Sequence, residues 1–119
     1  MIKISSQLLF ILPLALGVGL AMAFQTAINS KLREHLHSPF QAALLSFLVG
    51  TLVLACMVYF QSAAKPSLGE LAQIPWFLWI GGCLGVYAIS MSIYTAPKLG
   101  FLTFSGLVIF GQLVISMLL

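Results

Sequence analysis

The polar residues best placed to do chemistry in this sequence are two amides, Gln25 and Asn29, at the end of a long apolar run. Residues four positions apart share one face of a helix, one turn above the other. An amide taken out of water is destabilising unless it finds a hydrogen-bond partner. Inside a membrane such amides join helices through hydrogen bonds worth about 0.6–2 kcal/mol, and polar residues also line substrate paths. Both roles are open for this pair.

Three more polar side chains lie within apolar runs. Gln112 follows Gly111 deep in the last run, and the same two roles are open for it. Ser90 and Tyr94 place hydroxyls on one face of the third run, where a tyrosine can line a ligand path or anchor the helix at the membrane interface. The candidates for lining a substrate path are therefore Gln25, Asn29, Ser90, Tyr94 and Gln112.

Other kinds of chemistry find no support in the sequence. No Ser/His/Asp or Cys/His arrangement, glycine-rich phosphate loop or cofactor motif occurs. His35 and His37 face different ways on a helix, and Cys56 and Cys83 lack the spacing of a metal site. Five basic residues divided between two faces form no stripe for nucleic acid. We therefore expect no catalytic residue, metal, cofactor or nucleic-acid partner, and the protein is not expected to be an enzyme.

The elements that must position these residues are four apolar runs, at 8–24, 40–60, 74–94 and 101–119, and all seven charged residues lie outside them. Only 6% of the residues are charged, against about 25% in soluble proteins. About 20 helical residues cross the hydrocarbon of a bilayer, and continuous runs without alternation exclude a barrel. The sequence predicts an all-α membrane protein with a single domain over 1–119. Its four transmembrane helices are expected at about 8–32, 39–60, 74–94 and 101–119.

Local signals predict where these helices begin and end. A ridge of small and polar residues at steps of four extends the first helix to about Leu36. Ser38 followed by Pro39 is a typical cap and first turn of the next helix. Residues 61–73 predict a loop, and residues 95–100 predict a tight connection with a proline and a glycine.

Small residues at every fourth position predict where helices pack closely. Pairs of this kind occur in each of the first three runs, and a further glycine precedes the amide of the fourth. These residues are Gly17, Ala21, Ser46, Gly50, Gly81, Gly82, Gly85 and Gly111. They predict packing faces and no activity.

The charges between the runs predict orientation only weakly. Four crossings place Lys3 and Lys65 on one side of the membrane and Lys31, Arg33 and Lys98 on the other. Orientation follows an excess of basic residues on the cytoplasmic side, and three against two is almost no excess. The balance favours two orientations and an antiparallel homodimer, and a fixed orientation with the N-terminus outside stays open.

A series of motifs runs through nearly the whole chain. They are Gln25-Thr-Ala-Ile-Asn29-Ser-Lys-Leu32, Ser38-Pro39, Ala42-Ala43-x2-Ser46-Phe47-x2-Gly50-Thr51, Pro75-Trp76-x2-Trp79-x-Gly81-Gly82-x2-Gly85, Ala96-Pro97-x-Leu99-Gly100 and Gly111-Gln112-Leu113. In this series the sequence resembles the YdcZ-type family of the drug/metabolite transporter superfamily. The spacing across four helices makes the series much more specific than any single motif.

The resemblance implies a small multi-pass exporter of the bacterial inner (cytoplasmic) membrane with an undefined small-molecule substrate. It also implies an antiparallel homodimer or a pair with an oppositely oriented paralogue. Related small multidrug-resistance exporters carry an acidic residue in the first helix, whereas this helix has none inside its apolar run. Proton exchange through an intramembrane carboxylate is therefore not expected.

The resemblance leaves two alternatives open beside a transporter subunit. Family members usually continue beyond the Gly-Gln pair of the fourth helix into an acidic turn motif and a fifth helix, and this chain ends at Leu119. The two alternatives to a transporter subunit are an inactive fragment of a five-span transporter and a non-transporting assembly or regulatory partner.

Overall fold

The structure of the chain is a computed structural model that describes residues 5–119, so that Lys3 of the charge count lies outside the described residues. All regular elements within this range are helices, and they form four segments that are long and apolar enough to cross a membrane, the third of which is Trp76–Leu99. The predicted all-α membrane fold is therefore confirmed. The elements are α1 (Ser6–Glu34), α2 (Pro39–Phe60), α3 (Leu68–Ala72), the 3-10 helix η1 (Trp76–Ile80), α4 (Gly81–Leu99) and α5 (Phe101–Leu118).

Serine side chains cap the first turns of three helices. The hydroxyl oxygen of Ser38 accepts a hydrogen bond from the backbone N–H of Gln41 at 3.2 Å, and Pro39 occupies the first turn of α2. This confirms the start predicted from the Ser-Pro pair. Ser5 and Ser67 cap α1 and α3 in the same way, and each such cap stabilises a helix by about 1 kcal/mol. The short helix α3 lies where the sequence predicts only a loop.

The reversal between α4 and α5 is sharper than the sequence predicts. Helix α4 continues through Pro97 to Leu99, so that Gly100 alone connects the two helices. Gly100 has a φ of 87°, a backbone conformation that is open almost only to glycine. Its N–H donates to the carbonyl of Ala96 at 2.9 Å, and its own carbonyl accepts from Phe104 at 2.9 Å. The reversal brings the end of α4 and the start of α5 to one end of the molecule.

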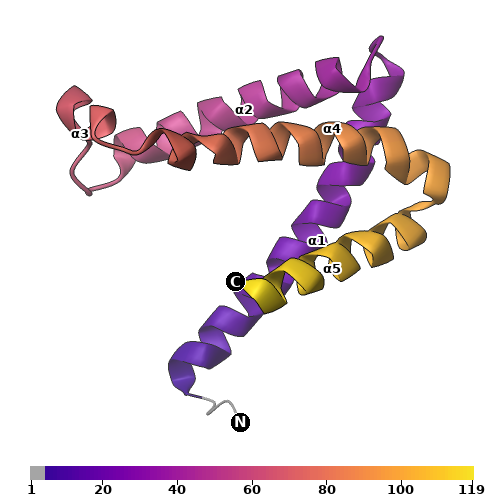
Figure 1. Cartoon of the computed structure of the whole chain (residues 1–119), viewed down its shortest axis with the longest axis horizontal. Coiled ribbons are helices and arrows are strands. Elements are labelled where there is room, and N and C mark those ends of the chain that lie inside the picture. Colours follow the sequence, from indigo (N-terminus) through magenta and orange to yellow (C-terminus); the bar gives the residue numbers. More distant parts are fainter. Residues whose placement is uncertain (1–4) are drawn as a thin grey trace.

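Helices α2 and α4 run side by side in opposite directions, and α1 crosses them at a steep angle (Figure 1). The small core lies at this crossing. It consists of Ala42, Ala43 and Ile93, against which Leu32, Leu36 and Ile89 pack. Each of the three helices thus contributes to the core, while α5 contacts α4 and α1 but not α2.

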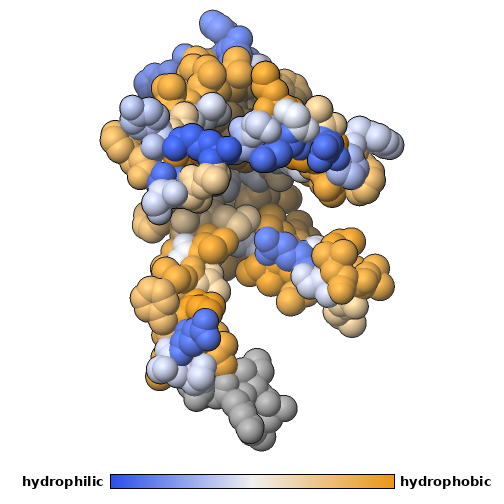
Figure 2. Space-filling view, turned by 90° about the vertical axis from the view of Figure 1, so that its left-hand side faces the viewer, coloured by the Kyte–Doolittle hydropathy of each residue, from blue (hydrophilic) through white to orange (hydrophobic). Residues whose placement is uncertain are grey.

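The rest of the chain is open. Two arms extend from the crossing, namely the first part of α1 (residues 6–24) and α5, and neither contains a buried residue. Figure 2 shows mostly apolar arms separated by open space. The described surface measures 10,020 Å², whereas a compact protein of this mass exposes about 6,300 Å². The excess of about 3,700 Å² is available to lipid or to another chain.

Helix α1 is longer than a membrane is thick. Its 29 residues extend about 43 Å, while the hydrocarbon core of a bilayer measures about 30 Å. The helix therefore crosses with a tilt or extends out of the hydrocarbon at its polar end. Where the membrane surface cuts each helix stays a prediction from the sequence.

Candidate functional site

Two polar side chains are buried within residues 5–119, and both belong to the residues predicted to line a path. Asn29 of α1 has 5% of its surface exposed, and Ser90 of α4 has none. They come from two helices in direct contact, in the region where the core residues of α2 also gather. We call this meeting point of α1, α2 and α4 the junction. The fold thus buries two polar residues that lie about 60 positions apart in the sequence, each on a helix that packs against the other.

The hydroxyl of Ser90 differs from two neighbouring hydroxyls in its hydrogen bonding. Ser30 donates to the carbonyl of Thr26 at 2.8 Å, and Thr95 donates to the carbonyl of Met91 at 2.7 Å. Such bonds to the preceding turn satisfy a hydroxyl inside its own helix. In contrast, the oxygen of Ser90 is buried without a hydrogen-bond partner in the described part of the chain. A buried polar group left in this way destabilises the fold by about 1–3 kcal/mol, so the hydroxyl is free to receive a further partner.

Tyr94 lies one helical turn beyond Ser90 and forms part of the wall of a groove. Its side chain is about half exposed, at 51%. The ammonium group of Lys98 lies 4.4 Å from the centre of the tyrosine ring, which is a cation–π contact. The groove runs between the last turns of α1 and of α4. Tyr94 is therefore placed between the buried junction and a charged surface.

The two remaining candidates for lining a path are exposed. Gln25 lies one turn before Asn29 on α1, yet its side chain is outside the junction. Gln112 is exposed on the arm formed by α5. A single chain therefore buries Asn29 and Ser90, places Tyr94 one turn beyond Ser90 at the groove, and leaves Gln25 and Gln112 on open surfaces.

The small residues predicted to pack helices divide in a similar way. A methyl group added at Gly85 of α4 would lie 3.6 Å from the ring of Phe47 of α2, which is ordinary contact across that helix pair. Ser46 is partly buried and Ala21 is exposed. The remaining glycines, at which an added methyl group would meet no atom within 4 Å, are Gly17, Gly50, Gly81, Gly82 and Gly111. Their role as packing faces stays a prediction, and these faces are open to a second chain.

Sequence reasoning did not identify the charged groove as a site. In the sequence, Arg33 and Lys98 contribute only to the count of charges on the two sides of the membrane, and both line the groove. The signal that could have found them is the charge count, which already placed both on one side of the membrane. The described residues contain no cluster of three His, Cys, Asp or Glu side chains that could hold a metal, and Cys56 and Cys83 are exposed thiols.

Comparison with known protein families gives a match over most of the chain. The family model described as "Putative inner membrane exporter, YdcZ" matches residues 10–119, which is nearly the whole chain. No curated protein and no solved structure matches the chain significantly.

Proposed function

The chain belongs to the YdcZ family of inner membrane exporters, and from this premise we propose that it exports a small molecule as an antiparallel homodimer. The family is described as an inner membrane exporter, which is a kind of transporter, and the four long apolar helices agree with a multi-pass protein of the inner membrane. The finer points of the proposal are the inverted pairing of two copies and a path lined by uncharged polar groups.

The observation that carries the pairing is the open first arm of α1. Within residues 6–24 no side chain is buried, although this arm carries Gly17 and Ala21, a spacing typical of close helix packing. Permanent dimers bury about 2,000–5,000 Å² summed over both partners, which is about 1,000–2,500 Å² per chain, so the excess of about 3,700 Å² on each chain is large enough for such an interface. A second copy laid against the arms would use the faces that a single chain leaves empty.

The distribution of charge supports an inverted pair. Lys31, Arg33 and Lys98 lie at one end of the helices, because α1 ends there and α4 returns to the same end. Lys65 follows α2 and lies at the opposite end. With Lys3 added from the sequence, neither end has an excess that fixes orientation.

A path through such a pair would be lined by uncharged groups. Asn29 lies five residues before the end of α1, which is about 7.5 Å along the helix axis. The junction of each copy is therefore nearer to one membrane surface, and inversion would place the two junctions toward opposite surfaces. The exposed amides Gln25 and Gln112 would then extend the polar lining between them, as at the repeat interface of inverted-repeat transporters. Neither acidic residue of the chain, Glu34 nor Glu70, lies inside an apolar run, so a carboxylate within the membrane has no part in this path.

The pairing is tested by the accessibility of single cysteines in intact cells. Cys56 and Cys83 are first replaced by alanine, and Ser5→Cys and Leu119→Cys are then compared, because four crossings place both positions on one side. A membrane-impermeant maleimide should label one population from outside, and the remainder should react only in inverted vesicles. Labelling from one side only would remove the inverted homodimer.

Transport itself needs a separate measurement, because a non-transporting partner protein could also pair. Purified chain reconstituted alone into liposomes should move a compound that the chain exports from cells. Activity that requires a longer, oppositely oriented paralogue would assign the chain to assembly or regulation instead.

A further inference from the structure

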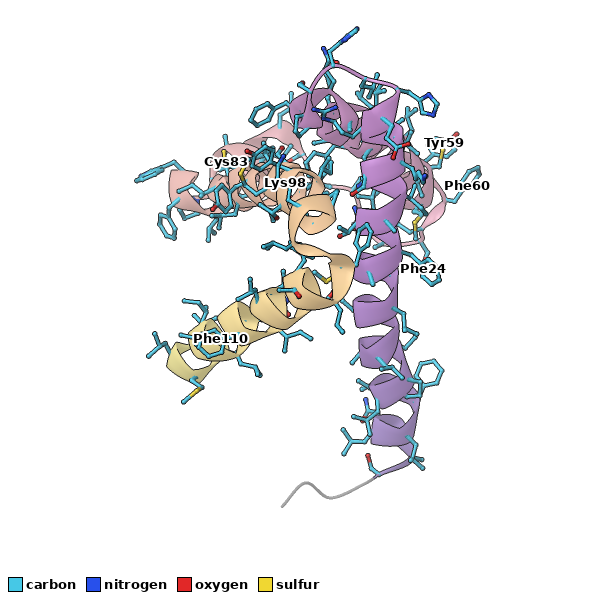
Figure 3. The ribbon with its side chains drawn as sticks, turned by 90° about the vertical axis from the view of Figure 1, so that its right-hand side faces the viewer. Phe24, Tyr59, Phe60, Cys83, Lys98 and Phe110 are labelled. Atoms are coloured by element: carbon cyan, nitrogen blue, oxygen red, sulfur yellow. The ribbon has the colours of Figure 1, made fainter. Side chains whose placement is uncertain are left out.

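The groove at the ends of α1 and α4 is strongly charged, and the transport proposal does not use it. It has a volume of about 500 Å³, within the range of small-molecule sites. Its lining includes three cationic side chains, Lys31, Arg33 and Lys98, and one carboxylate, Glu34. Figure 3 shows Lys98 at the end of α4 that lies beside α1. The groove therefore has a net charge of about +2 at neutral pH.

The single carboxylate of the groove, Glu34, does not neutralise Arg33 or Lys98. Glu34 lies 3.7 Å from the ammonium nitrogen of Lys31, and both side chains are well exposed. This is the only salt bridge within residues 5–119, so that Arg33 and Lys98 have no acidic partner there. A guanidinium nitrogen of Arg33 donates to the carbonyl of Leu36 at 3.5 Å, and Lys98 is held over the ring of Tyr94. Both cations are thus oriented by neutral groups and keep donors for an anion.

The helix ends at the groove do not cancel this charge. The C-termini of α1 and α4 each contribute a partial charge of about −0.5, which by itself would repel an anion. However, α2 begins at Pro39 and α5 begins at Phe101, and both residues also line the groove. Their N-termini contribute about +0.5 each. The partial charges of the four helix ends therefore sum to about zero, and the charged side chains determine the net charge of the groove.

The shape of the lining indicates what kind of anion fits. Beside the cations, the groove has apolar walls formed by Ile93, Pro97 and Phe101. The groove lies where the helices leave their apolar runs, so the sequence predicts it at the level of the lipid headgroups. A free ion would use the cations alone, whereas an anionic phospholipid would place its phosphate on the cations and the first methylene groups of its acyl chains on the apolar walls. We propose that this groove is a binding site for the phosphodiester headgroup of an anionic phospholipid.

The proposal is tested by native mass spectrometry of the purified full chain, titrated with phosphatidylglycerol or with phosphatidylcholine. We expect one tightly retained phosphatidylglycerol for each chain and no comparable retention of phosphatidylcholine. Arg33→Gln and Lys98→Gln should each weaken binding about fivefold, the factor that corresponds to ~1 kcal/mol for one basic residue near an anionic surface. Lys65→Gln is the matched control, because it removes the same charge at the far end of α2 and should change binding less than twofold.

A variant with improved binding guards against loss of folding. Glu34→Gln removes the only carboxylate of the groove and frees Lys31, so that binding should tighten several-fold, a result that a misfolded chain would not give. Equal weakening by Lys65→Gln, or no tightening by Glu34→Gln, would overturn the site. Competition by inorganic phosphate at the same concentration as the lipid would show a site for a soluble anion and would overturn the lipid assignment.

Discussion

Replacement of Ser90 by alanine tests whether the junction is built for packing or for a ligand. The hydroxyl of Ser90 is fully buried and has no hydrogen-bond partner among the described residues. Removal of an unsatisfied buried hydroxyl recovers a desolvation cost of about 1–3 kcal/mol. Alanine is also a better helix former than serine by about 0.5 kcal/mol. Ser90→Ala should therefore raise the free energy of unfolding by about 1–3 kcal/mol and should lower transport if the hydroxyl lines the path.

The measurement is equilibrium unfolding in mixed micelles of a mild detergent and dodecyl sulfate, followed by far-ultraviolet circular dichroism. Ser92→Ala is the matched control on the same helix, because the hydroxyl of Ser92 already donates to the carbonyl of Ala88 and is not fully buried. It should change stability by less than about 0.5 kcal/mol. If Ser90→Ala is destabilising by 1 kcal/mol or more, on the order of one hydrogen bond, the hydroxyl has a partner in the working protein and our reasoning is wrong. Stabilisation with unchanged transport per dimer would instead remove Ser90 from the path.

Three further substitutions test other parts of the structure. Gly100→Ala should destabilise the chain by about 1–3 kcal/mol in the same unfolding assay, because its φ of 87° strains any other residue, whereas Gly106→Ala inside α5 should be neutral or stabilising. Asn29→Ala should lower export from cells while crosslinking still detects the dimer, and loss of the dimer with unchanged transport per dimer would assign Asn29 to packing. Gly17→Leu should weaken dimerisation in a crosslinking assay and leave the helix content of the single chain unchanged, since a methyl group added there meets no described atom within 4 Å; an unaffected dimer would show that this face contacts lipid.

Most of the fold could be predicted from the sequence because it depends on local chemistry. Seven charges confined to the gaps between apolar runs predict four helices, and the Ser38-Pro39 pair predicts where α2 begins. The short helix α3 was missed, since five residues with a serine cap give little periodic signal. The length of the third connection was wrong, because Pro97 lies in the last turn of α4 instead of ending the helix before it.

The candidate site was predictable only in part, because burial depends on where another helix crosses. Gln25 and Asn29 share a face of α1 and look equivalent in the sequence. Only Asn29 is buried, because α1 packs against α2 and α4 near its C-terminal end and diverges from them toward its N-terminus (Figure 1). Asn29 and Ser90 are both buried where α1 and α4 pack together, and no local pattern predicts which segments distant in sequence pack against each other. The charged groove was missed for the same reason, because its cations come from two separate helices.

The groove and the inverted pair constrain each other. In an inverted pair, Arg33 and Lys98 of one copy lie at one membrane surface, and those of the other copy lie at the opposite surface. An anion that stabilises both copies must therefore be available at both surfaces. A soluble anion confined to one compartment would stabilise only one orientation and would shift the balance that the charge count leaves nearly even. An anionic phospholipid that occurs in both leaflets is available at both membrane surfaces, and it would stabilise the two orientations alike. Lipid binding at the groove is therefore the form of anion binding that is compatible with two oppositely oriented copies of one chain.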